Sequence, residues 1–436
     1  MPAIEHRGRF VASTAEDNLW TNVAAGATPT ETSGRRAFRT VPDDLYQSIP
    51  ISRWAQTLLQ EPEFQRLRDV SLSDIPGSIL FGRAFPSRLI HSLGVYYLAR
   101  LSRPRDRALQ AAALAHDIGH GPFSHLSEPL MVERLGMDHE TRSVALFRRV
   151  IMRANRSAAR LLNWLDIDEV GSLISASGNV GRAALLNGRL DYDNLDHVAR
   201  FMRAAELGEP MHDGRVVARG LRLVAGPNGE EEVALTDDLW SQARAWQTDR
   251  AVVFQFLQSD PMNGAAHGML RKAIDLAAVS GHIDGNFFDF TDGEALVFLR
   301  ACPDSRTLVG RILARQPYQT TWEGDVLDAA TDVATAFARA EGRLALEARI
   351  AMESGLSEDD VVVTFVVSRV ERPLPPLLSR MSEAHAGQRV SEPPERFLRV
   401  LTPPGLASDY VRRAQMAIER ILGGMGARSR VWPDLR

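Results

Sequence analysis

The sequence predicts a mainly α-helical protein with a β-hairpin insertion and a small C-terminal α+β lobe. Apolar residues recur every three or four positions over most of residues 42–350, which is the spacing of helices that bury one face. The alternating stretch 214–236 contains a Pro-Asn-Gly turn signal, which is typical of a β-hairpin. Two further stretches, 360–370 and 396–402, predict strands near the C-terminus.

These patterns divide the 436 residues into three parts. Residues 1–41 are rich in Ala, Thr, Ser, Gly and Arg with little apolar periodicity, and they predict a poorly ordered N-terminal arm. Residues 42–350 form the expected helical domain, and residues 351–436 form the expected α+β lobe.

Each expected helix shows apolar residues at three- and four-residue intervals, and Pro62 and Pro122 suit the first turns of two of them. The expected helices are 51–60, 62–70, 87–101, 107–117, 122–136, 139–155, 158–165, 168–175, 188–207, 239–258, 265–279 and 325–352, with 407–422 in the lobe.

Composition restricts the cellular setting and the partners. The formal net charge of −4 gives no overall attraction to nucleic acid or to an anionic membrane. Cys302 is the only cysteine, so no disulfide forms within the chain and we expect a cytoplasmic protein. No apolar run approaches the roughly 18 residues of a membrane-spanning helix, so we expect no membrane partner. Lys272 is the only lysine, so cationic contacts to phosphate would have to come from arginine.

The stretch 111–125, AAALAHDIGHGPFSH, organises the chain. An apolar helix ends in the adjacent pair His116 and Asp117, and His120 and His125 follow closely. A buried charge must be paired or bound to a metal, which makes a metal site a natural interpretation. Adjacent side chains point roughly 100° apart on a helix, so both reach one ion only near the end of the helix.

Two positions elsewhere offer further ligands for such an ion. His91 lies in an otherwise apolar helix, and an aspartate is available from Asp191, Asp193 or Asp196. Taken singly, a histidine in an apolar helix is more often a core residue, and aspartates at a helix start usually cap it. The combination of His, His-Asp and Asp on helices of one domain predicts a metal site.

These stretches resemble a known family. SRLIHSLGVYYLARL, ALAHDIGHGPFSH and LDYDNLDHVAR are similar to the HD-domain metal-dependent phosphohydrolases, most of all to their deoxynucleoside triphosphate triphosphohydrolase branch. The resemblance implies an HD-domain helical fold and a hydrolase that acts on phosphoester bonds of nucleotides. It implies release of a (deoxy)nucleoside and triphosphate, one divalent metal ion per chain (Fe, Mn or Mg) and a homo-oligomer.

The resemblance also implies roles for residues that match the family motifs. The implied metal ligands are His91, His116, Asp117 and Asp193. Four protein ligands leave open positions on an octahedral ion for a water and a phosphate oxygen.

The remaining implied site residues surround the phosphates. Arg88 and His139 match residues that contact phosphate, and His120 and His125 match histidines beside the scissile phosphate. Glu128 stands where the family carries an aspartate that orients the second of these histidines. A histidine near its ordinary pKa of about 6.5 suits proton transfer to the leaving oxygen.

The sequence departs from the branch where substrate is recognised. Asn194 replaces a lysine that contacts triphosphate, His197 replaces an aromatic contact, and Phe201 replaces an aspartate that binds a sugar hydroxyl. Leu72 stands at the position of a glutamine that contacts the sugar. Losing such hydrogen bonds changes how a site discriminates, so the nucleotide is left open.

Three alternatives follow from the same residues. The first is a phosphohydrolase of another nucleotide, such as a mono- or diphosphate or a modified or cyclic nucleotide. The second is an HD-type di-iron oxygenase, in which His120 and His139 would add ligands. The third is a nucleotide- or nucleic-acid-binding protein that uses the arginine-rich stretch 148–160, although a solvated helix face is favoured there at this net charge.

Overall fold

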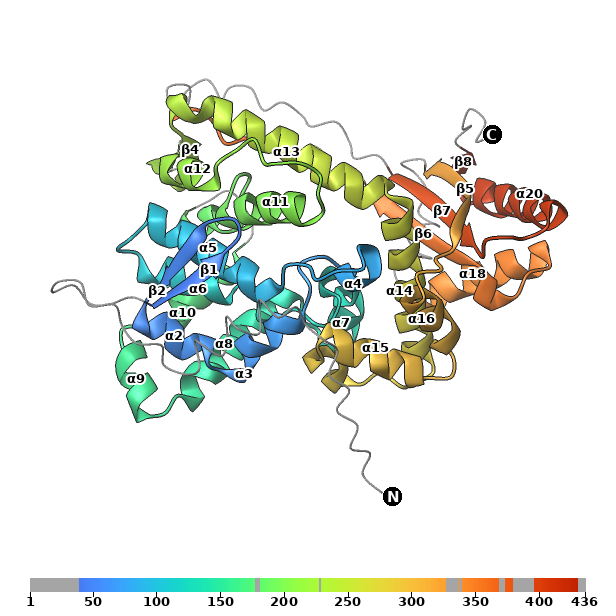
Figure 1. Ribbon diagram of the computed structural model, residues 1–436, viewed down its shortest axis with the longest axis horizontal. Helices are drawn as coiled ribbons and strands as arrows, with labels where there is room; N and C mark the ends of the chain where they lie inside the picture. The colour runs from blue at the N-terminus through green and yellow to red at the C-terminus, as the bar shows by residue number, and fades with distance from the viewer. Residues whose placement is uncertain are drawn as a thin grey trace, which may run out of the picture.

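Helices dominate the computed structural model, which describes residues 39–176, 181–226, 229–326, 337, 339–367, 373–378 and 396–429. A large helical body holds the N-terminal half, and the long helix α13 runs along its edge toward α14 and a smaller lobe with a β-sheet (Figure 1). The predicted mainly α fold is therefore confirmed.

The helices of the body carry most of the apolar core. Their bounds are α2 (Arg53–Leu59), α3 (Pro62–Arg66), α4 (Gly77–Leu80), α5 (Arg88–Ser102), α6 (Arg107–Ala115), α7 (Glu128–Leu135), α8 (His139–Arg153), α9 (Arg156–Leu162), α10 (Ile167–Ser175), α11 (Tyr192–Ala204), α12 (Gly214–Gly220), α13 (Trp240–Ser259), α14 (Pro261–Val279), α15 (Asp292–Ala301) and α16 (Arg306–Leu313).

Side-chain caps fix where the central helices begin. Ser87 accepts a hydrogen bond from the backbone N–H of Ile90 and starts α5, and Asp106 does the same for Leu109 at the start of α6. Asp138 caps α8 through the N–H of Thr141. Such caps satisfy backbone donors that a helix leaves free at its first turn, so they set the register of α5, α6 and α8.

Two β-hairpins flank the helical core. The predicted hairpin is confirmed as β3 (Leu221–Ala225) paired antiparallel with β4 (Glu231–Leu235). The first part of the predicted stretch, 214–220, is helix α12 instead. A second hairpin, β1 (Arg39–Asp43) with β2 (Gln47–Ile51), was not predicted. Its short strands and Pro50 conceal the strand pattern, yet the alternating residues of both strands are buried against the helical core.

The C-terminal lobe is a four-stranded sheet in the order β6-β7-β5-β8, with α18 and α20 packed on it. Its elements are β5 (Gln319–Val326), β6 (Val362–Val367), β7 (Arg396–Thr402), β8 (Ala427–Ser429), α18 (Ala340–Ser354) and α20 (Ser408–Gly424).

The expected helix 325–352 is wrong at its start. Asp325 lies in β5, where it pairs with Phe397 of β7, and α18 spans Ala340–Ser354; residues 327–336 and 338 lie outside the described residues. Strand β5 thus comes from the expected helical domain but completes the sheet of the lobe, while the division into domains stays a prediction. Residues 1–38 of the expected arm lie outside the described residues.

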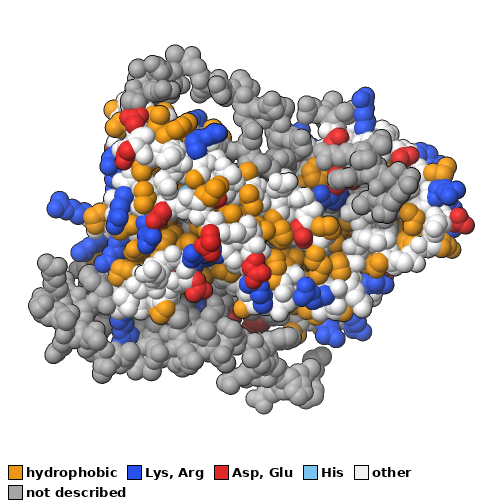
Figure 2. All heavy atoms as spheres, turned by 45° about the horizontal axis from the view of Figure 1, so that its top comes forward, with side chains coloured by type: hydrophobic (Ala, Val, Ile, Leu, Met, Phe, Trp, Pro, Cys, Tyr) orange, Lys and Arg blue, Asp and Glu red, His pale blue; other side chains and the backbone are white. Residues whose placement is uncertain are grey.

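Two observations concern the predictions about membranes and nucleic acid. Among the described residues, no helix is both long enough and apolar enough to cross a membrane. On the face drawn in Figure 2, basic side chains of the described residues are spread out and stand beside acidic ones near the centre.

Candidate metal centre

Helices α5 and α6 pack against each other and bring His91 and His116 together. Alanines 111, 112, 113 and 115 of α6 are fully buried, and these small side chains allow close approach of the neighbouring helix. His116 follows the last residue of α6 as its C-cap. The Nδ1 atom of His116 lies 2.9 Å from the carbonyl of Ala113, which accepts its hydrogen and leaves Nε2 free to bind a cation.

Buried hydrogen bonds hold the turn that follows His116. The Oγ of Ser143 donates to the carbonyl of His116 at 2.6 Å and accepts the N–H of Gly119 at 2.8 Å. Phe123 adopts a left-handed backbone conformation with φ of 61°, and its N–H donates to Asp292 at 2.7 Å. A backbone fixed in this way positions the side chains of the turn before any ligand binds.

The four expected metal ligands converge on one point. The Nε2 atom of His91 lies 2.9 Å from Asp193 Oδ1 and 3.7 Å from Asp117 Oδ2. The Nε2 atom of His116 lies 3.3 Å from Asp117 Oδ1 and 3.8 Å from Asp193 Oδ1. His91, His116 and Asp117 form a group whose ligand atoms are close enough to hold one metal ion.

The chemistry of these atoms fits a divalent cation. Both Nε2 atoms are buried and make no well-aligned hydrogen bond to the described residues, although carboxylate oxygens lie 2.9 to 3.8 Å from them. Buried polar atoms without partners are rare and call for an explanation. Two imidazoles with two carboxylates are ligands that Fe(II) and Mn(II) accept, and the open positions suit a phosphate oxygen.

Electrostatics at the same point favours positive charge. Burial alone lowers the pKa of His91, but the carboxylates of Asp193 and Asp196 outweigh it and raise the pKa to about 9. Burial raises the pKa of Asp117, but Arg88 and the neighbouring histidines hold it well below its ordinary value. The carboxylates therefore remain ionised where a cation would bind.

The three candidate aspartates, Asp191, Asp193 and Asp196, make three different kinds of contact. Asp191 caps α11 by accepting the N–H of Asn194 at 2.7 Å, as expected of an aspartate at a helix start. Asp193 faces His91 and His116. Asp196 accepts a hydrogen bond from Nδ1 of His91 at 2.8 Å, which holds the ring with Nε2 toward Asp193.

Sequence reasoning missed the support behind His91. Arg200 binds both carboxylate oxygens of Asp196, each at 2.8 Å, and also Asp43 Oδ2 at 2.8 Å. All three side chains are buried. The four-residue spacing of Asp196 and Arg200 was a signal for this pair, whereas Asp43 could be recognised only once β1 was known.

A cluster of three histidines adjoins the ligands. His120 Nε2 lies 3.2 Å from Asp117 Oδ1, and the His120 ring stacks on His139 with 4.1 Å between centroids. The His125 ring stands 4.8 Å from His120 and 5.2 Å from His139. Burial, and then the charges of Arg88 and His139, hold the pKa of His120 well below its ordinary value.

Glu128 joins two of these histidines. Its Oε2 lies 2.9 Å from Nδ1 of His125, and its Oε1 accepts both the backbone N–H and Nδ1 of His139. Burial raises the pKa of Glu128, but the hydrogen bonds from the two histidines lower it strongly. Glu128 is thus a carboxylate that holds His125 and His139 in one arrangement.

Arg88 completes the group. Its Nη1 lies 3.0 Å from Asp117 Oδ2, and its Nε donates to Ser124 Oγ at 2.9 Å. A guanidinium has five N–H groups, and those of Arg88 that Asp117 and Ser124 do not engage can bind a phosphate. The structure therefore brings all nine expected site residues into one region.

Residues at the expected recognition positions have a different character. The amide of Asn194 donates to Asp191, so it is engaged within its own helix. His197 stacks on Phe201 with 5.9 Å between centroids and meets His91 edge-on at 6.0 Å. Phe201 is fully buried and also contacts Phe85 at 5.2 Å. This side of the site is aromatic.

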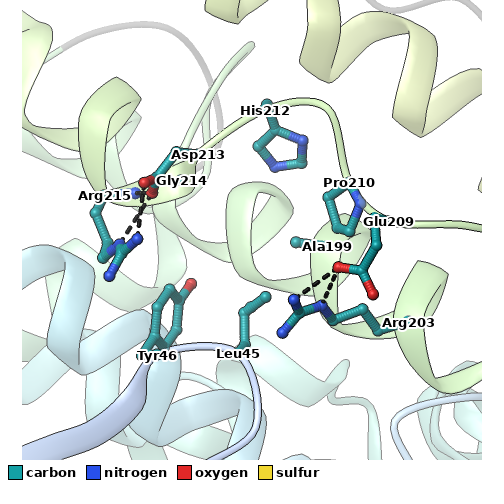
Figure 3. A pocket seen from close by; sticks show the side chains of 10 residues that line it. All are labelled: Leu45, Tyr46, Ala199, Arg203, Glu209, Pro210, His212, Asp213, Gly214 and Arg215. Carbon is teal, nitrogen blue, oxygen red and sulfur yellow. Dashed lines mark hydrogen bonds and ion pairs between the residues drawn. The ribbon is translucent and has the colours of Figure 1, made fainter.

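A pocket of about 210 Å³ lies apart from these residues (Figure 3). It is formed by the turn of the first hairpin, α11 and residues 209–215, and it contains none of the expected site residues. Its two arginines are paired within it, Arg203 with Glu209 and Arg215 with Asp213. Pockets for small molecules usually exceed about 300 Å³, so we do not assign substrate to it.

Comparisons with known proteins agree with this geometry. Residues 88–207 match the family model of the HD domain, a span that begins at Arg88 and contains every expected site residue. The chain is 35% identical to the deoxynucleoside triphosphate triphosphohydrolase SAMHD1 of Gallus gallus over 128 residues, which cover 25% of this chain and 20% of the relative.

Two further relatives extend the similarity. The SAMHD1 homolog of Dictyostelium discoideum is 26% identical over 208 residues, covering 39% of this chain and 37% of that protein. A putative HD domain-containing protein of Acanthamoeba polyphaga mimivirus is 28% identical over 209 residues, covering 40% of this chain and 45% of that protein. The matches thus span less than half of each relative. The HD domain and the similarity to these triphosphohydrolases, both expected from the motifs, are confirmed.

Proposed function

We propose that this HD-domain chain is a metal-dependent phosphohydrolase that acts on nucleotides, with a deoxynucleoside triphosphate as the first candidate substrate. The observation that carries the proposal is a pair of buried nitrogens, Nε2 of His91 and of His116, which face the carboxylates of Asp117 and Asp193 without a well-aligned hydrogen bond to any described residue. The adjoining histidines and Arg88 supply the groups that phosphate chemistry needs.

His91, His116, Asp117 and Asp193 would hold a divalent ion, Fe(II), Mn(II) or Mg(II), one per chain. When bound, such an ion stabilises negative charge on a phosphoryl oxygen and makes water easier to deprotonate. Asp196 keeps His91 in the tautomer that offers Nε2, and Arg200 holds Asp196 in place.

Arg88 would bind the oxygens of the phosphate under attack, because it is fixed by Asp117 and Ser124 and is always charged. His125 would give a proton to the departing oxygen from Nε2 while its Nδ1 donates to Glu128. His120 and His139 would contact the phosphate beside it. In the reaction, a water oxygen bonds to phosphorus and releases a proton to solvent, and the bond from phosphorus to the nucleoside oxygen breaks. That oxygen takes the proton of His125, which yields a (deoxy)nucleoside and triphosphate.

The substrate follows from the relatives only as a candidate. Two of them are deoxynucleoside triphosphate triphosphohydrolases by name, but the aromatic residues His197 and Phe201 occupy the expected recognition positions here. Other nucleotides, including mono- and diphosphates and modified or cyclic nucleotides, remain candidates for the same chemistry.

A nucleotide panel tests the proposal. The purified full chain, loaded with Mn(II), is incubated with dNTPs, NTPs, nucleoside mono- and diphosphates and cyclic nucleotides, and products are separated by ion-exchange chromatography. Release of tripolyphosphate and nucleoside from a dNTP supports the proposal with a deoxynucleoside triphosphate as substrate. Release of orthophosphate only identifies another nucleotide phosphohydrolase, and no release from any nucleotide contradicts the proposal.

One observation favours a second candidate, an HD-type di-iron oxygenase. His120, His125 and His139 form a second group whose ligand atoms are close enough to hold an ion. Two irons per chain together with dioxygen consumption would support the oxygenase, whereas one ion per chain and products of phosphate hydrolysis favour the hydrolase. We keep the hydrolase first because Glu128 already engages two of these three histidines.

A further inference from the structure

Arg271 of α14 is an unusual arginine. Its Nε is buried, and the side chain forms no hydrogen bond or ion pair with any residue that the structure describes. The residue as a whole is partly buried, and buried arginines such as Arg88 and Arg343 have carboxylate partners, Asp117 and Asp275. Partly removing a guanidinium from water without a partner among the described residues has a cost, so an arginine at such a position suggests a role in binding an anion.

The position of Arg271 connects it with the candidate metal centre. His267 lies one turn earlier on the same face of α14, and its Nε2 is 3.8 Å from Asp74 Oδ2. The other oxygen of Asp74 accepts the backbone N–H of His125 at 3.1 Å. Through Asp74, this face of α14 therefore adjoins the turn that carries His125.

The charges around Arg271 leave it available for an anion. Burial lowers the pKa of His267, Asp74 raises it, and the charge of Arg271 lowers it further, as expected for neighbours. Asp275 also acts on Arg271, but Arg343 binds both oxygens of Asp275, at 2.7 and 2.6 Å. Asp74 is the remaining carboxylate near His267 and Arg271, and its two oxygens face His125 and His267.

We propose that Arg271 and His267 form an anion subsite that holds the outer phosphates of a polyphosphate substrate whose scissile phosphate lies at the metal centre. The inference rests on the proposed function and narrows it, because Arg88, His125, His267 and Arg271 then form a continuous series of phosphate-binding groups. Arginine suits the role, since its planar fork binds two phosphate oxygens together. A monophosphate would not reach this subsite.

The subsite makes a prediction about stability as well as binding. A partly buried cation without a partner among the described residues contributes little to folding, so Arg271→Gln should leave the melting temperature unchanged or raise it. A purely structural arginine would behave in the opposite way, and its loss would lower the melting temperature.

Calorimetric titration of the Mn-loaded full chain with tripolyphosphate and with orthophosphate tests the proposal. Arg271→Gln should weaken tripolyphosphate binding about tenfold to hundredfold, the range for hydrogen bonds to charged groups, and leave orthophosphate binding and metal content unchanged. Arg271→Lys should fall between, because it keeps the charge but lacks the fork. Arg300→Gln, on the exposed end of α15, is the matched control and should resemble wild type.

Equal weakening of both anions, or no weakening of either, would overturn the subsite. If Arg271→Gln fails to fold, Arg271→Lys still tests it, since unchanged tripolyphosphate binding in that variant excludes a fork-dependent contact. The outcome is distinct from failure of the proposed function. Selective loss of tripolyphosphate binding in a chain that hydrolyses no nucleotide would contradict the enzyme but retain the subsite.

Discussion

The two sides of His91 differ in the kind of contact that shapes them. Toward α6, which we call the ionic side, Arg88, His116 and Asp117 are buried and joined by hydrogen bonds and ion pairs. Toward the C-terminal half of α11, which we call the aromatic side, His197 and Phe201 meet further aromatic rings at centroid distances of 5 to 6 Å. Charged atoms on the ionic side have fixed positions, whereas on the aromatic side the partly exposed ring of His197, backed by the buried Phe201, offers a surface for stacking.

This difference indicates that one side of the site carries out catalysis and the other selects the nucleotide. Groups that stabilise charge at phosphorus must be placed before substrate binds, and the buried network on the ionic side does so. Aromatic rings hold a flat group through area and stacking and discriminate weakly between hydroxyl patterns. We therefore expect substitutions on the ionic side to abolish turnover and those on the aromatic side to change which nucleotide is preferred.

Asp117→Asn should give the largest effect. It removes a carboxylate that faces both His91 and His116, so metal content should fall to background and turnover by roughly a thousandfold or more. Inductively coupled plasma mass spectrometry and a product assay on the same sample measure both. Asp166→Asn is the control, because asparagine also caps a helix and α10 lies outside the site. Normal metal content with full turnover in Asp117→Asn would remove Asp117 from the site.

His125→Ala should keep the metal and lose most of the rate. Without the proton donor, kcat should fall by about 10²- to 10⁴-fold while bound metal stays at the wild-type level. Glu128→Gln should have a smaller effect and should alter the pH profile of kcat, because both His125 and His139 lose their carboxylate. A kcat for His125→Ala within twofold of wild type would exclude it as the proton donor.

Asp196→Asn should lower the affinity for the metal rather than the turnover of the metal-loaded protein. Loss of a carboxylate behind a ligating histidine typically costs about tenfold to a hundredfold in metal affinity. Turnover should recover at saturating metal, which distinguishes a positioning residue from a ligand. Asp191→Asn retains a helix cap and should leave metal affinity near wild type. Equal metal affinities in the two variants would contradict the role given to Asp196.

His197→Ala should give the smallest effect and the clearest sign of the aromatic side. Loss of ring stacking worth about 1 kcal/mol should raise KM about fivefold with little change in kcat. The ratio of kcat/KM between purine and pyrimidine nucleotides should change as well. A large loss of kcat without a change in that ratio would place His197 with the ionic side instead.

The residues of the ionic side are also the ones that the sequence predicts best. His91, the His116–Asp117 pair and Asp193 stand out because charged residues in apolar helices are uncommon, and their spacing matches a known motif. The helices α5, α6, α8 and α11 follow from periodicity and capping residues, which act locally.

Other features depend on contacts between distant parts of the chain. The role of Asp196 rests on Arg200 and on Asp43 in an unpredicted hairpin. Strand β5 forms because it pairs with β7, more than seventy residues later in the sequence, and no local pattern near Asp325 announces this. Arg271 looks like an ordinary polar residue of an amphipathic helix until its lack of partners among the described residues is seen.

A metal titration with turnover measured on the same samples tests the central claim most directly. The full chain is stripped of metal, reloaded with Mn(II) in steps, and assayed for hydrolysis of the best nucleotide in the panel while bound metal is counted. Turnover should rise in proportion to bound metal and reach its maximum at one ion per chain. Full turnover without metal, or a maximum reached only at two ions per chain, would contradict a mononuclear phosphohydrolase centre.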